Sequence, residues 1–142
     1  MQIRVWLGGL VLSCLSVPLS LAQSEPGAEL TQGAEIRYVE LKPTFVTNYG
    51  VSSSGHMRYI KADVTVRVGN RNGEYFVRYH LPALRDSLVL LLSRQDDSTV
   101  ASAAGREVIK AEAIGELTEV LMREEGEAVI EDLMFTNFVV QR

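Results

Sequence analysis

The chain has 142 residues, a length that suits one domain and is short for two. Apolar residues make up 46% of it and charged residues 23%, a composition typical of a globular protein rather than a disordered one. Its 18 acidic residues outnumber its 14 basic residues, so the net charge of −4 disfavours a nucleic-acid partner. One cysteine excludes an intramolecular disulfide, and one cysteine with two histidines does not favour a multi-ligand zinc site.

Residues 1–22 are predicted to be a signal peptide or a membrane anchor. Val5–Ala22 carries no charge, and Ser20 and Ala22 occupy the −3 and −1 positions of a signal-peptidase site. The 18 residues of this stretch also just reach the minimum span of a bilayer, although Pro18 disfavours a regular span. Both interpretations place the rest of the chain outside the cytoplasm. Cys14 is interpreted as a small residue of the signal core rather than as a lipoprotein acylation site.

Residues 23–34 are polar and contain Pro and Gly, so they are predicted to form a flexible linker before a folded domain over residues 35–142. Glu35–Thr47 alternates apolar and polar residues, which predicts a half-buried strand with a sheet edge or a bulge at Pro43. After a turn cluster, Arg58–Val68 shows the most regular period of two in the chain. These two strands are predicted to pair in the antiparallel sense.

The sequence of Glu74–Tyr79 is compatible with either a strand or a helix. Its residues are β-prone, and the Asn72-Gly73 pair ahead of it favours a hairpin, with Gly69–Gly73 as the turn or loop. Alternatively, the segment opens the next helix with Pro82 inside it. A proline in a helix interior costs about 3 kcal/mol, so the helix would then kink or restart there.

Two helices are predicted in the second half of the chain. Leu84–Arg94 carries leucines at positions i, i+4, i+7 and i+8 and has little polar face, so this helix is expected to be largely buried. Gln95–Thr99 is predicted to be a polar turn. The second helix is expected over Ala103–Glu125, with Ser102 as its N-cap and Gly126 as its stop.

The last segment, Ala128–Gln141, is apolar on both faces and is predicted to be a central strand covered on both sides. The order of elements is then β-β-α-α-β. Because strands and helices are segregated, the predicted class is α+β, with two main helices packed on an antiparallel or mixed sheet.

No catalytic motif is found in the sequence: it contains no nucleophile elbow, phosphate loop, His-Glu metal helix or paired cysteines. His56 is interpreted as a solvated loop residue and His80 as a structural one. Glu112 and Glu116 fit a solvated helix face better than an acid–base pair. No enzyme activity, cofactor or metal is therefore predicted, and a hydrolase built on these residues is the weakest hypothesis.

Arg85 and Asp86 are the candidate interface residues, because they are charges at the start of a helix that is otherwise apolar. Each must reach solvent, pair with another group or meet another chain, since an unpaired buried charge is costly. A structural interpretation places Asp86 near the positive helix N-terminus and pairs Arg85 with a nearby carboxylate. The functional interpretation has Arg85 facing a neighbouring copy or another subunit.

Several segments, taken together in order and spacing, resemble the FliL family of flagellar basal-body proteins. They run from Tyr38 to Gln141: Tyr38-Val-Glu-Leu-Lys-Pro43, Arg58-Tyr-Ile-Lys61, Leu81-Pro-Ala-Leu-Arg-Asp86, Leu90-Leu-Leu-Ser93, Gly105-Arg106, Lys110-Ala-Glu112 and Phe135-Thr-Asn-Phe-Val-Val-Gln141. The resemblance implies a periplasmic domain with a stomatin-like fold, located at the inner membrane around the motor. It also implies contact with stator units, support of swimming or swarming, and a ring-forming homo-oligomer.

The resemblance also bears on two open points. It implies that the segment from Glu74 through Ser93 is mainly helical. Members of the family usually carry a basic cytoplasmic tail and a membrane helix, whereas only four residues precede the apolar stretch here. A soluble periplasmic form, cleaved after Ala22, is therefore an alternative to an anchored one. A periplasmic scaffold or binding domain that acts away from the flagellum is the alternative function.

Overall fold

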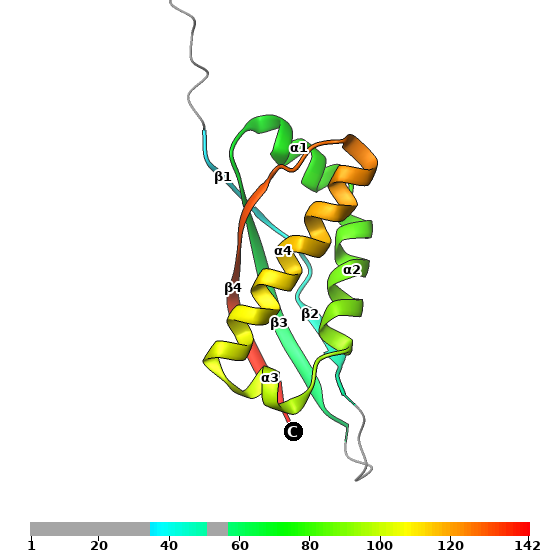
Figure 1. The fold of residues 1–142 in the computed structure, drawn as a ribbon, viewed down its shortest axis with the longest axis vertical. Helices are drawn as coiled ribbons and strands as arrows, with labels where there is room; N and C mark the ends of the chain where they lie inside the picture. Colours follow the sequence, from blue (N-terminus) through cyan, green and yellow to red (C-terminus); the bar gives the residue numbers. More distant parts are fainter. Residues whose placement is uncertain (1–34, 51–56) are drawn as a thin grey trace, which may run out of the picture. The chain divides into compact units, whose positions relative to one another are not determined.

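The computed structural model describes residues 35–50 and 57–142, so the predicted leader, the linker and His56 lie outside the described residues. The described part forms a four-stranded sheet and four helices in the order β1-β2-β3-α1-α2-α3-α4-β4 (Figure 1). The predicted α+β class is confirmed, and all strand pairs are antiparallel. The shorter predicted order differs because the first strand divides in two and two further helices form.

The sheet is built around β3 (Tyr59–Val68), which is paired along both of its edges. β1 (Arg37–Glu40) and β2 (Phe45–Asn48) follow each other along one edge, and β4 (Ile130–Gln141) occupies the other. The single strand predicted at the start is therefore two strands, and the break falls around Pro43, which has no N–H to donate. The prediction of β4 as a central strand is wrong: it pairs only with β3 within the described residues.

The segment after β3 is a helix, so the hairpin interpretation is wrong. α1 (Arg71–Tyr79) begins after Asn70, whose side chain accepts a hydrogen bond from the Gly73 N–H at 2.7 Å. Gly73 is buried against the side chains of Val68 and Val129, so a glycine here lets the helix approach the sheet closely.

Pro82 marks a restart between two helices rather than a kink. α1 ends at His80, and α2 (Leu81–Ser93) begins directly after it. Pro82 lies in the first turn of α2, where its missing N–H has no helical partner to lose. The helical interpretation of Glu74–Ser93 is thus confirmed, apart from the junction at His80.

The predicted polar turn before the last helix contains a short helix, α3 (Asp97–Ala101), which is capped by Asp96 and anchored by the buried Val100. α4 (Ala103–Glu125) has the predicted bounds. The Ser102 side chain accepts a hydrogen bond from the Gly105 N–H, and the helix ends at Gly126 in the left-handed region.

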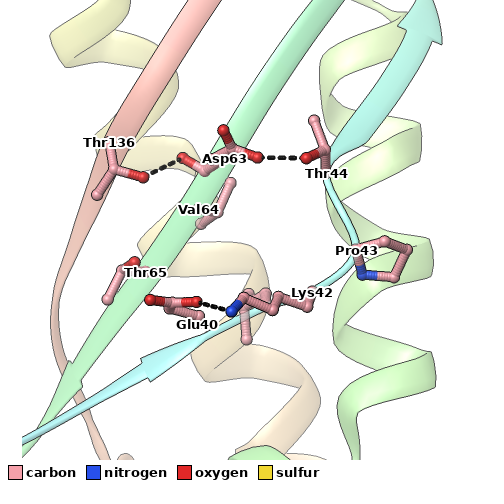
Figure 2. A pocket seen from close by; sticks show the side chains of 9 residues that line it. Glu40, Lys42, Pro43, Thr44, Asp63, Val64, Thr65 and Thr136 are labelled. Atoms are coloured by element: carbon pink, nitrogen blue, oxygen red, sulfur yellow. Dashed lines mark hydrogen bonds and ion pairs between the residues drawn. The ribbon is translucent and has the colours of Figure 1, made fainter.

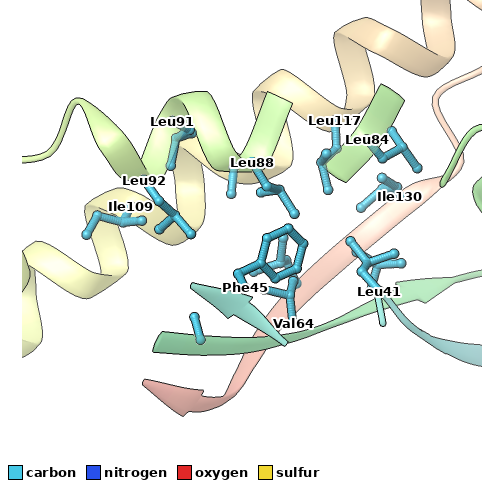
Figure 3. Close-up of a cluster of buried hydrophobic side chains, with 14 of the residues drawn as sticks. Leu41, Phe45, Val64, Leu84, Leu88, Leu91, Leu92, Ile109, Leu117 and Ile130 are labelled. Carbon is cyan, nitrogen blue, oxygen red and sulfur yellow. The ribbon is translucent and has the colours of Figure 1, made fainter. Parts of the chain in front are cut away.

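The core lies between one face of the sheet and the helices α2 and α4 (Figure 3). The predicted stripes supply it: the two helices contribute mainly leucines, and β1, β2 and β3 contribute alternate residues. Each fully buried leucine, isoleucine or phenylalanine contributes roughly 1.5–3 kcal/mol. The largest of them are Leu41, Phe45, Ile60, Leu84, Leu88, Leu91, Leu92, Ile109, Leu117, Leu121 and Leu133. No described helix covers the opposite face, which we call the outer face of the sheet.

We expect Gly105→Ala to destabilise the domain by about 1–3 kcal/mol. A Cβ at this position would lie 1.9 Å from the backbone oxygen of Thr99, so α3 and α4 would have to separate. Gly115→Ala in the same helix is the control, because its Cβ would meet nothing within 4 Å and alanine favours helix by about 1 kcal/mol. Urea denaturation checks both, and equal stability of the two variants would contradict the close α3–α4 approach.

Candidate interaction surface

Arg85 is held by the sheet rather than by a carboxylate. Its Nη1 donates hydrogen bonds to the backbone oxygens of Leu41, at 2.6 Å, and of Pro43. Its guanidinium carbon lies 4.1 Å from the centre of the Phe45 ring, a cation–π contact. Partial burial lowers the pKa of the guanidinium from its ordinary value. Arg85 thus closes the part of the sheet edge where β1 passes into β2, and the expected carboxylate partner is replaced by two carbonyl groups.

Asp86 lies in the second turn of α2, because the helix begins at Leu81 rather than at Leu84. The helix dipole acts mainly within the first turn, so the expected stabilisation of Asp86 by the helix N-terminus does not apply. Its side chain is exposed, and Leu90, one turn further along, is an exposed apolar residue. The two predicted interface residues therefore differ: Arg85 has partners within the domain, and Asp86 faces outwards.

An open hollow of about 430 Å³ lies on the outer face where the chain between β1 and β2 leaves β3 (Figure 2). Asp63 of β3 stands in it. Its carboxylate accepts a hydrogen bond from Thr44 Oγ1 at 2.6 Å and another from Asn137 Nδ2 at 3.2 Å. These two bonds, that from Thr44 first, lower the pKa of Asp63 below its ordinary value of 3.8. The rim carries the exposed Glu40–Lys42 ion pair.

The side chains in the hollow hold strands together and do not bring reacting groups into position. Asp63 of β3 is joined by side-chain hydrogen bonds to the β1–β2 connection, through Thr44, and to β4, through Asn137, and Thr136 adds one from its Oγ1 to the Asp63 backbone oxygen at 3.4 Å. Within residues 35–50 and 57–142, no three His, Cys, Asp or Glu side chains come together as a metal site. What the hollow offers chemically is hydrogen bonding to an ionised carboxylate.

The other polar candidates also have structural partners. His80 Nε2 lies 2.5 Å from Glu125 Oε1, which ties the α1–α2 junction to the end of α4. Glu116 accepts a hydrogen bond from Arg94 at 2.5 Å, and Glu112 accepts one from the buried Gln95 at 3.2 Å. The structure therefore separates these residues into different contacts and does not bring them together as an acid–base pair.

Two tyrosines form an exposed face on α1. Tyr75 and Tyr79 are 60% and 66% exposed, and their rings stack with centroids 5.9 Å apart. Their spacing of four residues places them on one helix face. This spacing was readable in the sequence, but its meaning depended on choosing helix over hairpin. Of the remaining tyrosines, Tyr38 and Tyr59 lie on the outer face and Tyr49 is buried.

In the part of the chain that the structure describes, none of the helices has the length and apolar character needed to cross a bilayer.

We expect Arg85→Ala to lower the free energy of unfolding by about 1–3 kcal/mol, because the carbonyl groups of Leu41 and Pro43 lose their donor and the contact with the Phe45 ring is lost. Asp86→Ala changes an exposed side chain and is expected to stay within about 0.5 kcal/mol of the natural protein. Thermal and urea unfolding check the pair. If Arg85→Ala were as stable as Asp86→Ala, Arg85 would not hold the sheet edge.

We expect the stabilising contribution of Asp63 to be lost in acid. A pKa below 3.8 in the folded state means that its contribution is complete above the ordinary value and is lost as the pH falls through the lower, folded value. Thr44→Val removes the main donor, so the pKa of Asp63 should rise towards 3.8 and its share of the acid-dependent loss should shrink. Carboxyl NMR titration of Asp63 in both proteins measures this; an unchanged pKa would contradict the assigned cause.

The amino-acid sequence matches a known protein family. A family model described as flagellar basal body-associated protein FliL matches residues 38–141, nearly all of the described domain. A flagellar protein FliL from Aquifex aeolicus (strain VF5) is 24% identical over 102 residues, which is 72% of this chain and 60% of that protein. The chain thus spans less than two thirds of this relative's length. The match confirms the resemblance carried by the seven segments: the chain belongs to the FliL family of flagellar basal body-associated proteins.

Proposed function

We propose that this domain acts as a non-enzymatic part of the flagellar basal body, on the periplasmic side of the inner membrane, where it contacts stator units and supports rotation for swimming and swarming. The observation that carries the proposal is the family match over residues 38–141. The charge-free stretch Val5–Ala22 supports the periplasmic placement, because both a signal peptide and an anchor lead there.

The proposed division of the chain follows from this placement. Residues 1–22 act as signal peptide or anchor, residues 23–34 as a linker, and residues 35–142 as the periplasmic domain. We also infer that its fold is stomatin-like and that copies associate with one another. An open antiparallel sheet with helices on one face and the other face uncovered supports a role in assembly, because it leaves much surface for contacts.

The stacked Tyr75 and Tyr79 are the proposed contact point for another basal-body or stator protein. Tyrosine is enriched in protein interfaces and at their energetic centres, and an exposed stacked pair offers a large, rigid, partly apolar area. Asp86 and Leu90 on α2 form a second candidate contact. Arg85 is proposed to support that contact by holding the sheet edge and to contribute to it with the exposed part of its side chain.

We expect the double substitution Tyr75→Ser with Tyr79→Ser to reduce swarming and the recovery of stator or basal-body proteins in pull-downs from solubilised membranes. The substitutions remove the apolar area of the contact but touch little of the core, so the domain is expected to stay folded by circular dichroism. Tyr38→Ser, which changes a similarly exposed tyrosine on the outer face, is the matched control.

The same pull-down distinguishes a role at the flagellum from the alternative role of a periplasmic scaffold that works away from it. Enrichment of stator or basal-body proteins by the natural chain, lost only in the double variant, supports the flagellar role. Enrichment of unrelated periplasmic proteins, together with normal swimming and swarming in a strain that lacks the gene, would instead favour a scaffold that works away from the flagellum.

A further inference from the structure

The two outer edges of the sheet differ in how they are protected against pairing with another strand. On the β1–β2 side the strands have four residues each, Pro43 interrupts them, and Arg85 occupies the carbonyl groups of Leu41 and Pro43. Short strands, proline and charged side chains are the usual ways in which proteins block a sheet edge. This edge is therefore closed.

The edge formed by β4 is open. The strand has 12 residues, it contains no Lys, Arg or Pro, and no described strand pairs with its outer side. Irregular register occurs in its first part, where Lys110 of α4 also pairs with Asp132 at 2.9 Å. The stretch Asn137–Gln141, in contrast, pairs with Tyr59–Asp63 in unbroken register. A regular, uncharged edge of this kind is a template for another strand.

The sequence of this stretch is complementary to itself. In an antiparallel pair centred on Val139, Asn137 faces Gln141, Phe138 faces Val140, and Val139 faces its own copy. Amide groups thus meet amide groups and apolar groups meet apolar groups. The acidic residues Glu131 and Asp132 lie at the far end of the strand, away from the centre of the pair.

We propose that two copies of this chain join β4 to β4 across a two-fold axis at Val139, so that their sheets continue into one. A second copy is the occupant because, among the described strands, only β4 presents an open edge, which prevents edge-to-edge growth from β4 of one copy to β1–β2 of the next. Pairing through the same edge in both copies gives a closed, isologous dimer. Val139 is 47% exposed, and the half-buried Phe138 and Val140 gain cover from the partner.

This inference deepens the self-association in the proposed function, and its test needs no flagellum. Val139→Glu places two like charges against each other at the axis, while within its own sheet the new carboxylate faces Lys61. Val46→Glu is a matched control: Val46 is 64% exposed and faces the same Lys61 from the other side, on the closed edge. Both variants are thus expected to fold.

Sedimentation of the full chain in detergent measures the dimer. We expect Val139→Glu to raise the dimer dissociation constant at least about tenfold and Val46→Glu to leave it within about twofold, because like charges brought together at an interface are costly. A natural chain that stays monomeric, or equal effects of the two variants, would overturn the proposal.

Cysteine cross-linking in the full chain tests the axis itself, in a Cys14→Ala background. Facing residues across an antiparallel pair have Cβ atoms about 4.5–5.5 Å apart, near the range that a disulfide bridges. We expect Val139→Cys to form a disulfide-linked dimer under mild oxidation and Val46→Cys to form little. Equal cross-linking of the two, or capture by Val139→Cys of a different polypeptide in place of a second copy, would contradict β4–β4 pairing.

Discussion

Strand β3 can bury only one of its faces, and the arrangement of the domain follows from that constraint. Its alternating residues direct Ile60, Ala62, Val64, Val66 and Val68 towards α2 and α4, and they are all buried. The helices therefore gather on one side, and the alternate residues, most of them charged or polar, lie on the outer face, where Thr65 is the one that is buried. Because β3 is paired on both edges, the strands beside it become the boundaries of the sheet.

One boundary of the sheet is closed and the other is open. Arg85 is responsible for this difference, because it closes the β1–β2 edge. By donating to the backbone of Leu41 and Pro43 and lying over Phe45, it converts the irregular passage between β1 and β2 into a closed edge. Nothing in residues 35–50 and 57–142 covers β4 along Asn137–Gln141 in a comparable way. The exposed tyrosines of α1 and the open edge of β4 lie on different elements, so contact with a partner protein and contact with a second copy can use separate surfaces.

The sequence was most informative where one physical rule decides the outcome. Ser102 and Gly126 marked the ends of α4 because an N-cap side chain and a left-handed glycine act locally. The class and the buried stripes followed from periodicity. α1 was ambiguous because its β-prone residues and the Asn72-Gly73 pair favour a hairpin locally and compete with the equally local cap from Asn70. What decides for the helix, the close packing of Gly73 against Val68 and Val129, depends on tertiary structure.

The candidate site was less predictable for a similar reason. Arg85 stood out as a charge on an apolar helix, but its partners are backbone groups 42 and 44 positions away, which no sequence pattern signals. The apolar sequence of Ala128–Gln141 predicts a central strand, but apolarity alone does not distinguish burial within a domain from an edge that receives another strand. The two explanations differ in what they expect on the outer side of β4: cover from the same domain, or a strand from another chain.

Amide hydrogen exchange of the full chain at low and high protein concentration tests the difference between the edges most directly. We expect the amides of Asn137–Gln141 to become more protected as concentration rises, while those of Arg37–Glu40 keep the same exchange rates at both concentrations. Protection that is independent of concentration in both strands, or that rises equally in both, would contradict one closed edge and one open edge.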